Sequence, residues 1–203
     1  RYAIRDSRWT SKGRALEDGH LVISAREILQ DVNERAAMDN VNPHFKPIRV
    51  YLESVIVSGM LPTKHQRLSD YLNLGAGYEC FALKDSSAED FDGHPFAVNS
   101  GEFLIYKPEV ILVTDMRETE KAGSSEVNLE RIDKESRKFM LSVGPFWPQG
   151  TIHLLPGTTP QQVLTGNTGF VPLTEARLLK PVQSELRTFV INQTKIGVLA
   201  SLD

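Results

Sequence analysis

Short blocks of β-branched and aromatic residues recur along this chain, and they predict a protein built mainly of strands. Residues 48–57 form the first clear block, and an acidic loop is expected at residues 85–99. Two later blocks, at 102–106 and 110–114, predict a hairpin joined across residues 107–109. Further strands are expected at residues 80–83, 170–173, 188–192 and 195–199.

Two short helices are predicted between these strands. Residues 67–73 carry Leu68, Tyr71 and Leu72 at helical spacing, and Gly75 follows as a stop signal. In the second helix, Thr159 has the position of a cap, and Gln162 is placed to return a hydrogen bond to it. Each helix is short and has a single apolar face.

A longer helix is predicted nearer the N-terminus, at residues 24–38. Ser24 and Glu27 have the spacing of a capping box, and Ile28, Leu29 and Val32 form one apolar stripe. Isolated helices of about 12–15 residues are marginal in water, so this one should be ordered only by docking. It is expected to dock either on the rest of the chain, to which residues 21–23 could add a strand, or on another subunit.

The last two-thirds of the chain contain the same pattern twice. Residues 103–113 match residues 189–199 without a gap, so that Phe103 corresponds to Phe189. Further upstream, residues 80–85 match 170–175, and residues 60–62 match 154–156. The offset between matching positions falls in order along the chain, as a duplicated unit with shortened loops would give.

The predicted fold is α+β and predominantly antiparallel β, with two tandem pseudo-symmetric repeats. Each repeat is expected to form a small barrel or sheet with one short helix. The predicted boundaries are 1–46 for an N-terminal arm and docking helix, 47–116 for the first repeat, 117–138 for a charged linker and 139–203 for the second repeat. Units of about 60–65 residues bury too little surface to be stable alone, so the repeats should pack together.

The first repeat also contains the run Arg67-Leu-Ser-Asp-Tyr-Leu-Asn73, which precedes the strand expected at residue 80. This stretch resembles an uncharacterised bacterial domain family that shares an Arg-Leu-Ser-Asp-x-Leu-Asn motif before a strand. The second repeat has Thr159-Pro-Gln-Gln162 in place of these letters, so the resemblance covers the first repeat only. It implies a bacterial, soluble module and carries no activity with it.

Composition and charge restrict the compartment and the class of partner. The formal charge is −3, from 26 acidic and 23 basic residues, whereas proteins that wrap nucleic acid usually have a basic surplus. The single cysteine, Cys80, excludes an internal disulfide and a Cys-rich zinc site, and its apolar surroundings predict a buried, inert thiol. No run approaches the roughly 18–20 apolar residues of a membrane-spanning helix, and a cytoplasmic location is expected.

The sequence contains no recognisable catalytic motif. The phosphate-binding, dinucleotide-binding, zinc-protease and nucleophile-elbow patterns are all missing, and the five histidines are scattered. Asp85, Glu89, Asp90 and Asp92 with Gly93 resemble half of a calcium loop, but the bidentate Glu that should follow is replaced by Asn99. We therefore expect no enzyme activity, no cofactor and no metal ion.

Two groups of residues are candidates for contact with a partner. Arg67 and Asp70 are neighbours on the first short helix, where a surface ion pair or a favourable carboxylate in the first turn is the simpler explanation. The other group is a basic arm around an aromatic residue, and it consists of Arg5, Arg8, Trp9, Lys12 and Arg14.

These observations favour a non-catalytic binding or assembly module, in which a duplicated β platform contacts a protein partner or another copy. The alternative is a small-barrel protein that binds nucleic acid or a nucleotide, because a short helix with five strands is also how such modules are built.

Overall fold

The computed structural model of the chain describes residues 15–17, 20–22, 44–63, 67–73, 79–98, 101–117, 133–165 and 169–202. The chain divides into two compact units, Arg1–Pro43 and His44–Asp203. In the first unit, β1 (Ala15–Glu17) and β2 (His20–Val22) pair antiparallel. The helix predicted at residues 24–38 lies outside the described residues.

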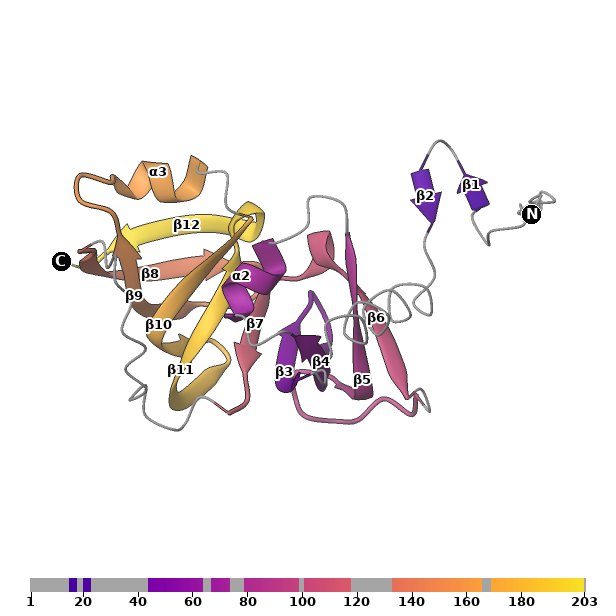
Figure 1. Cartoon of the computed structure of the whole chain (residues 1–203). Coiled ribbons are helices and arrows are strands. Elements are labelled where there is room, and N and C mark those ends of the chain that lie inside the picture. The colour runs from indigo at the N-terminus through magenta and orange to yellow at the C-terminus, as the bar shows by residue number, and fades with distance from the viewer. Residues whose placement is uncertain are drawn as a thin grey trace, which may run out of the picture. The chain divides into compact units, whose positions relative to one another are not determined.

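The second unit contains the same series of elements twice (Figure 1). Its first half consists of β3 (His44–Tyr51), β4 (Ile56–Thr63), α2 (Leu68–Asn73), β5 (Cys80–Glu89), β6 (Glu102–Tyr106), the 3₁₀ turn η1 (Lys107–Glu109) and β7 (Leu112–Asp115). Its second half consists of β8 (Glu135–Val143), β9 (Pro148–Leu154), α3 (Pro160–Thr165), β10 (Phe170–Leu179), β11 (Val182–Asn192), the 3₁₀ turn η2 (Gln193–Lys195) and β12 (Ile196–Ser201). In both halves the order is strand, strand, helix, strand, strand, 3₁₀ turn, strand.

Ten of the described strands form one antiparallel sheet in the order β12-β8-β9-β10-β11-β7-β3-β4-β5-β6. The prediction of a predominantly antiparallel β protein is therefore confirmed. The sheet is open rather than closed into a barrel, with β12 at one end and β6 at the other. Within each half, the fifth strand pairs with the first and forms one border of that half, and the fourth strand forms the other border.

The strand registers also agree between the halves. Arg49 lies opposite Thr114 where β3 pairs with β7, and Met140 lies opposite Ala200 where β8 pairs with β12. Leu83 lies opposite Phe103 in the first half, and Leu173 lies opposite Phe189 in the second. A slip of one residue would turn every side chain to the other face of the sheet. The agreement in register therefore means that equivalent residues of the two halves face the core.

Alternating side chains from the strands build two adjacent hydrophobic cores. In β8, Phe139, Leu141 and Val143 are fully buried, as expected for a strand with one face on the core. Each core also receives residues from the other half: Phe170 and Val190 pack in the core that β3 to β5 line. In the other core, Tyr51 of β3 lies edge-on to Phe146 at a centroid distance of 5.4 Å.

The two short helices form where they were predicted. At α3, the backbone N–H of Thr159 donates to Gln162 Oε1 at 2.7 Å, and the backbone N–H of Gln162 donates to Thr159 Oγ1 at 3.3 Å. This is the reciprocal capping box that the sequence indicated. At α2, Leu68 and Leu72 point into the core.

Both halves have an irregularity at the same place, where the second strand pairs with the third. The register shifts between Ser58 and Met60 in the first half, and between Thr174 and Arg177 in the second. The third strand passes through a positive φ there, 47° at Asp85 and 48° at Glu175. A glycine of the second strand faces each irregularity, Gly59 in β4 and Gly150 in β9, and allows the backbones to approach closely.

Three local predictions are wrong. Residues 48–57 are not one strand, because Leu52 donates its N–H to Val55 O at 2.9 Å and turns the chain between β3 and β4. The expected loop at 85–99 begins later, since β5 continues to Glu89. The charged linker ends earlier, because β8 begins at Glu135.

The predicted hairpin at residues 102–114 is also wrong. β6 and β7 follow each other across η1, but β6 pairs with β5, whereas β7 pairs with β3 and β11. The 3₁₀ turn, with Pro108 inside it, redirects the chain instead of folding it back on itself. As a result, the fourth and fifth strands of each half lie on opposite sides of that half.

Candidate assembly surface

The two halves of the sheet meet where β11 pairs with β7, and this contact is called the junction below. The opposed residues are Phe189 and Thr114, Val190 and Val113, and Ile191 and Leu112. All six are at most 3% exposed. The junction is therefore a fully desolvated contact between the fourth strand of one half and the fifth strand of the other.

Polar side chains reinforce the junction at both ends. Asn192 is 4% exposed, and its Nδ2 donates to Val110 O at 2.8 Å. Thr114 Oγ1 donates to Thr188 O at 2.9 Å. The first bond satisfies the buried carbonyl group of Val110, which would otherwise destabilise the fold by about 1–3 kcal/mol, and the second satisfies a carbonyl group in a partly buried place.

A second contact across the junction comes from α2. Asn73 Nδ2 donates to Phe170 O at 2.8 Å, and Phe170 N–H donates to Asn73 Oδ1 at 2.8 Å. Lys107 Nζ donates to Leu72 O at 3.2 Å, and burial lowers the pKa of Lys107. Asn73 was not among the residues singled out in the sequence, although it ends the Arg-Leu-Ser-Asp-x-Leu-Asn run. The helix that carries this run thus ties one half to the other.

The outer edges of the sheet, β6 and β12, hold the same positions in their halves as β11 and β7 hold at the junction. Along β6, Leu104 is 41% exposed and Tyr106 is 44% exposed. The corresponding residues of β11 are Val190, which is 3% exposed, and Asn192. Along β12, Val198 is 48% exposed, whereas its counterpart in β7, Leu112, is completely buried. The outer edges therefore present apolar side chains at positions that the junction buries.

The outer edges have few of the features that usually protect a free strand. Natural edge strands are shielded by charged residues, prolines or bulges that discourage pairing with other chains. β12 runs Ile-Gly-Val-Leu-Ala-Ser and contains neither a charged residue nor a proline, and its one irregularity is a register shift against β8 between Ile196 and Val198. β6 contains a single charged residue, Glu102, at its first position. Such edges are suited to accept a further strand.

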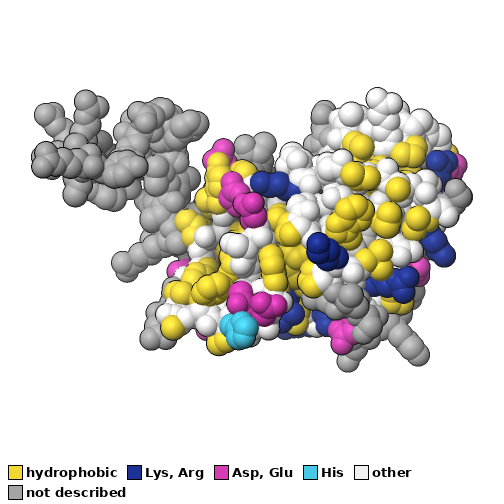
Figure 2. Space-filling model, turned by 180° about the vertical axis from the view of Figure 1, so that it is seen from behind, with side chains coloured by type: hydrophobic (Ala, Val, Ile, Leu, Met, Phe, Trp, Pro, Cys, Tyr) yellow, Lys and Arg dark blue, Asp and Glu magenta, His cyan; other side chains and the backbone are white. Residues whose placement is uncertain are grey.

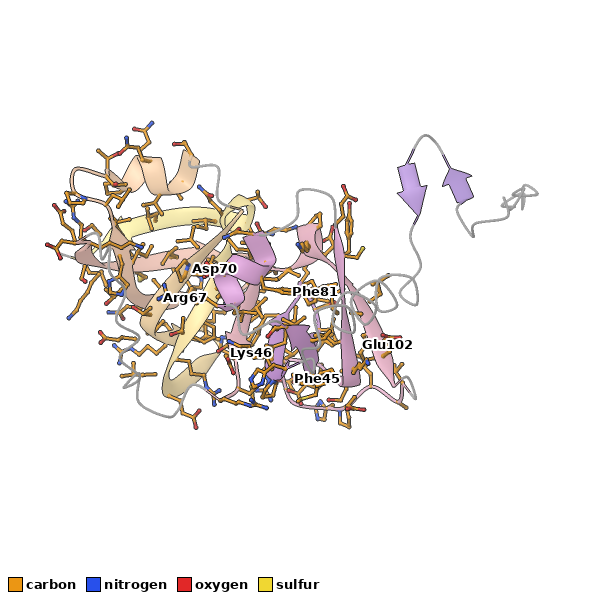
Figure 3. The ribbon with its side chains drawn as sticks, viewed as in Figure 1. Phe45, Lys46, Arg67, Asp70, Phe81 and Glu102 are labelled. Atoms are coloured by element: carbon orange, nitrogen blue, oxygen red, sulfur yellow. The ribbon has the colours of Figure 1, made fainter. Side chains whose placement is uncertain are left out.

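The partner-binding candidates from the sequence lie away from these strands or outside the described residues. Figure 3 shows Arg67 and Asp70 together at α2, and both are exposed. The carboxylate of Asp70 accepts from Ser69 Oγ at 3.4 Å, and no ion pair joins Asp70 to Arg67 among the described residues. The basic arm, with Arg5, Arg8, Trp9, Lys12 and Arg14, lies outside the described residues.

The lone thiol is less buried than predicted. Cys80 is the first residue of β5 and lies opposite Tyr106 of the edge strand β6. It is partly exposed. Its counterpart Phe170 is buried at the junction. Burial and the nearby carboxylate of Glu79 raise the pKa of Cys80, which disfavours the reactive thiolate.

A cluster of Asp90, Asp92 and His94 follows β5, where the sequence indicated half of a calcium loop. The ligand atoms of these three side chains lie within 4.8 Å of one another. Asp90 Oδ1 accepts from the backbone N–H of Asp92 at 2.9 Å and of His94 at 2.8 Å, and Asp90 Oδ2 lies 3.0 Å from His94 Nδ1. The carboxylate thus closes its own loop, and this arrangement is sufficient to explain the cluster.

The Asp90–His94 contact gives a titration that can be measured. The hydrogen bond to Asp90, together with the charge of Asp90, raises the pKa of His94 above 6.5. The interaction is therefore complete at mildly acidic pH, where His94 is protonated and Asp90 is ionised, and it is lost as the pH rises through the pKa of His94 in the folded chain. In Asp90→Asn, the pKa of His94 measured by NMR titration should fall toward 6.5. Asp92→Asn should lower it less, and an equal fall in both variants would contradict the assignment.

Comparisons of the chain with family models, with curated proteins and with solved structures found no match. Among the described residues, no helix is long and apolar enough to cross a membrane.

Proposed function

We propose that this chain is a non-catalytic binding and assembly module, formed by duplication of one β-rich unit, that contacts a protein partner through the outer edges of its sheet. The observation that carries the proposal is the contrast between the outer edges and the junction. Leu104 and Val198 are exposed, while the residues at the same positions of the other half are buried. A strand added to either edge would bury these side chains and pair backbone groups on the side where no strand of the described residues lies.

The duplication is supported by features beyond the sequence match. The order of elements, the strand registers, the two positive-φ residues and the two close-approach glycines all recur. The register contradicts one part of the sequence match, that of residues 60–62 with 154–156, since Met60 corresponds to Thr151 rather than to Leu154. Two copies of one unit already form a tight contact with each other through edge strands, which makes strand addition the natural binding mode of this unit.

A protein partner is favoured over nucleic acid by the surface chemistry. On the face drawn in Figure 2, the described Lys and Arg side chains are separated by acidic and hydrophobic ones. Nucleic-acid surfaces instead gather basic residues into a patch or stripe. The exposed large side chains of the outer edges are those of Leu104, Tyr106 and Val198, which suit a protein strand.

The proposal is tested by capture of partners from nuclease-treated extract, followed by purification of the captured protein. We expect the purified partner to bind the native chain in a calorimetric titration and to lose binding in the variant Leu104→Lys, Val198→Lys. The matched control is Leu155→Lys, because Leu155 is 50% exposed but lies outside both edges. Equal binding by the edge variant would refute the proposal. So would capture that occurs from untreated extract but not from nuclease-treated extract.

A further inference from the structure

We propose that the partner of the outer edges is a second copy of this chain, with β6 of one copy paired antiparallel to β12 of the next. This inference rests on the proposed function, because it names the partner of the same two edges. The junction supplies the template. There, a fourth strand, β11, pairs with a fifth strand, β7. The two strands that end the sheet formed by the described residues are again one fourth strand, β6, and one fifth strand, β12.

The template fixes the register of the contact between copies. Transferring the junction pairs to the equivalent positions places Phe103 opposite Ala200, Leu104 opposite Leu199, and Ile105 opposite Val198. Leu104 would then enter the contact as Val190 does at the junction, and Val198 as Leu112 does. All six residues are uncharged, so no like charges would face each other across the ladder.

The burial of side chains at the junction shows what a second copy would cover. Val190 of β11 packs in the core of the first half, and Leu112 of β7 packs in the core of the second. By the same geometry, Leu104 of one copy would enter the core formed by the second half of the next copy. Val198 of that next copy would in turn meet the core of the first half to which Leu104 belongs. The contact would thus bury Leu104 and Val198, which are now 41% and 48% exposed.

The short helices give an independent indication of the same contact. Leu72 and Leu164 are both the fifth residue of a six-residue helix, α2 and α3 respectively. Leu72 is 3% exposed, but Leu164 is 39% exposed. Its helix, α3, lies beside β12 (Figure 1). α2 spans the junction through the bonds between Asn73 and Phe170. By analogy, α3 would span the contact between copies and reach the other copy at Cys80, which is the counterpart of Phe170.

The contact between copies is heterologous, since each copy contributes β6 at one side and β12 at the other. A contact of this kind closes into a ring or continues as a filament, depending on the rotation between copies. It also differs from a two-fold dimer in a way that cross-linking detects, because no residue faces its own counterpart.

The test uses full-length chains that carry Cys80→Ser and one new cysteine each. Directly opposed residues in an antiparallel pair have Cα atoms about 4.5–5.5 Å apart, within the range of a disulfide. We expect a mixture of Leu104→Cys and Leu199→Cys chains to form a disulfide-linked dimer under mild oxidation. Each variant alone should give none. The mixture of Leu104→Cys with Ala200→Cys should also give none, because a shift of one residue points the side chains to opposite faces.

Light scattering on the native chain supplies the second measurement. The mass should exceed the 22.7 kDa of one chain and should return to that value in Leu104→Lys, whose folding is checked by its thermal melt. A monomeric native chain without the mixed disulfide would overturn the proposal, and so would self-cross-linking of Leu104→Cys. In that case, edge-dependent binding of another purified protein would leave the proposed function standing, whereas its absence would end both.

Discussion

Gly150→Ala is expected to destabilise the chain by about 3 kcal/mol, the upper part of the usual range for an overpacked core. A Cβ at Gly150 would lie 2.6 Å from Ala176 Cβ, 2.8 Å from Thr174 O and 2.9 Å from Ala176 Cα. None of these atoms is the end of a flexible side chain, so β9 and β10 would have to separate. The midpoint of urea denaturation measures the loss.

The matched control for this substitution is Gly59→Ala, at the same position of the first half. There the nearest atom is Ser86 Oγ at 2.7 Å, which can turn away, and the next is Lys84 O at 3.0 Å. Rotation would sacrifice the bond from Ser86 Oγ to Leu83 O, so a smaller loss of about 1 kcal/mol is expected. A larger loss at Gly59 than at Gly150 would contradict this account of the close approach.

Much of the local structure could be predicted from the sequence because it depends on neighbouring residues. The capping box of Thr159 and Gln162 and the apolar face of Leu68 and Leu72 are each contained within one turn or two of helix. The predominance of antiparallel strands follows in the same way from the β-branched blocks.

The pairing of strands could not be predicted because it depends on contacts between distant parts of the chain. β7 pairs with β3 and β11, although β6 is its nearest neighbour in sequence. The turn at residues 52–55 was missed for a related reason, since it contains neither glycine nor proline and interrupts an apolar run. Hydrophobic periodicity reports which side of a strand is buried but not which strand lies beside it.

The candidate surface was invisible in the sequence for the same physical reason. Leu104 and Val190 are both apolar residues of a fourth strand, and only their places in the sheet make one exposed and the other buried. The sequence did match the two positions, since the block at 103–113 aligns with 189–199. One difference between the two blocks was a usable signal of the buried position. Asn192 occupies the position that Tyr106 has in the first half, and it supplies the hydrogen-bond donor that the junction needs.

Asn192→Leu is expected to destabilise the chain by about 3 kcal/mol, because it removes several bonds from a buried position. Val110 O would lose the donor at 2.8 Å, and Thr194 would lose the acceptor of its N–H at 3.1 Å and of its hydroxyl at 2.8 Å. Asn192 is 4% exposed, so water cannot replace these bonds without opening the junction. Urea denaturation measures the loss, and amide exchange at Phe189 and Ile191 should accelerate with it.

The decisive comparison is Tyr106→Leu, which makes the same residue at the equivalent position of the outer edge. In dilute chain, where β6 pairs with β5 but with no second copy, Tyr106 is 44% exposed, and the change in stability should stay within about 0.5 kcal/mol. The difference between the losses of stability in the two variants then measures how much this position stabilises the fold when a fourth strand is paired with a fifth. If Asn192→Leu were no more destabilising than Tyr106→Leu, the junction would not be held by these bonds. It would then lose its value as a template for the outer edges.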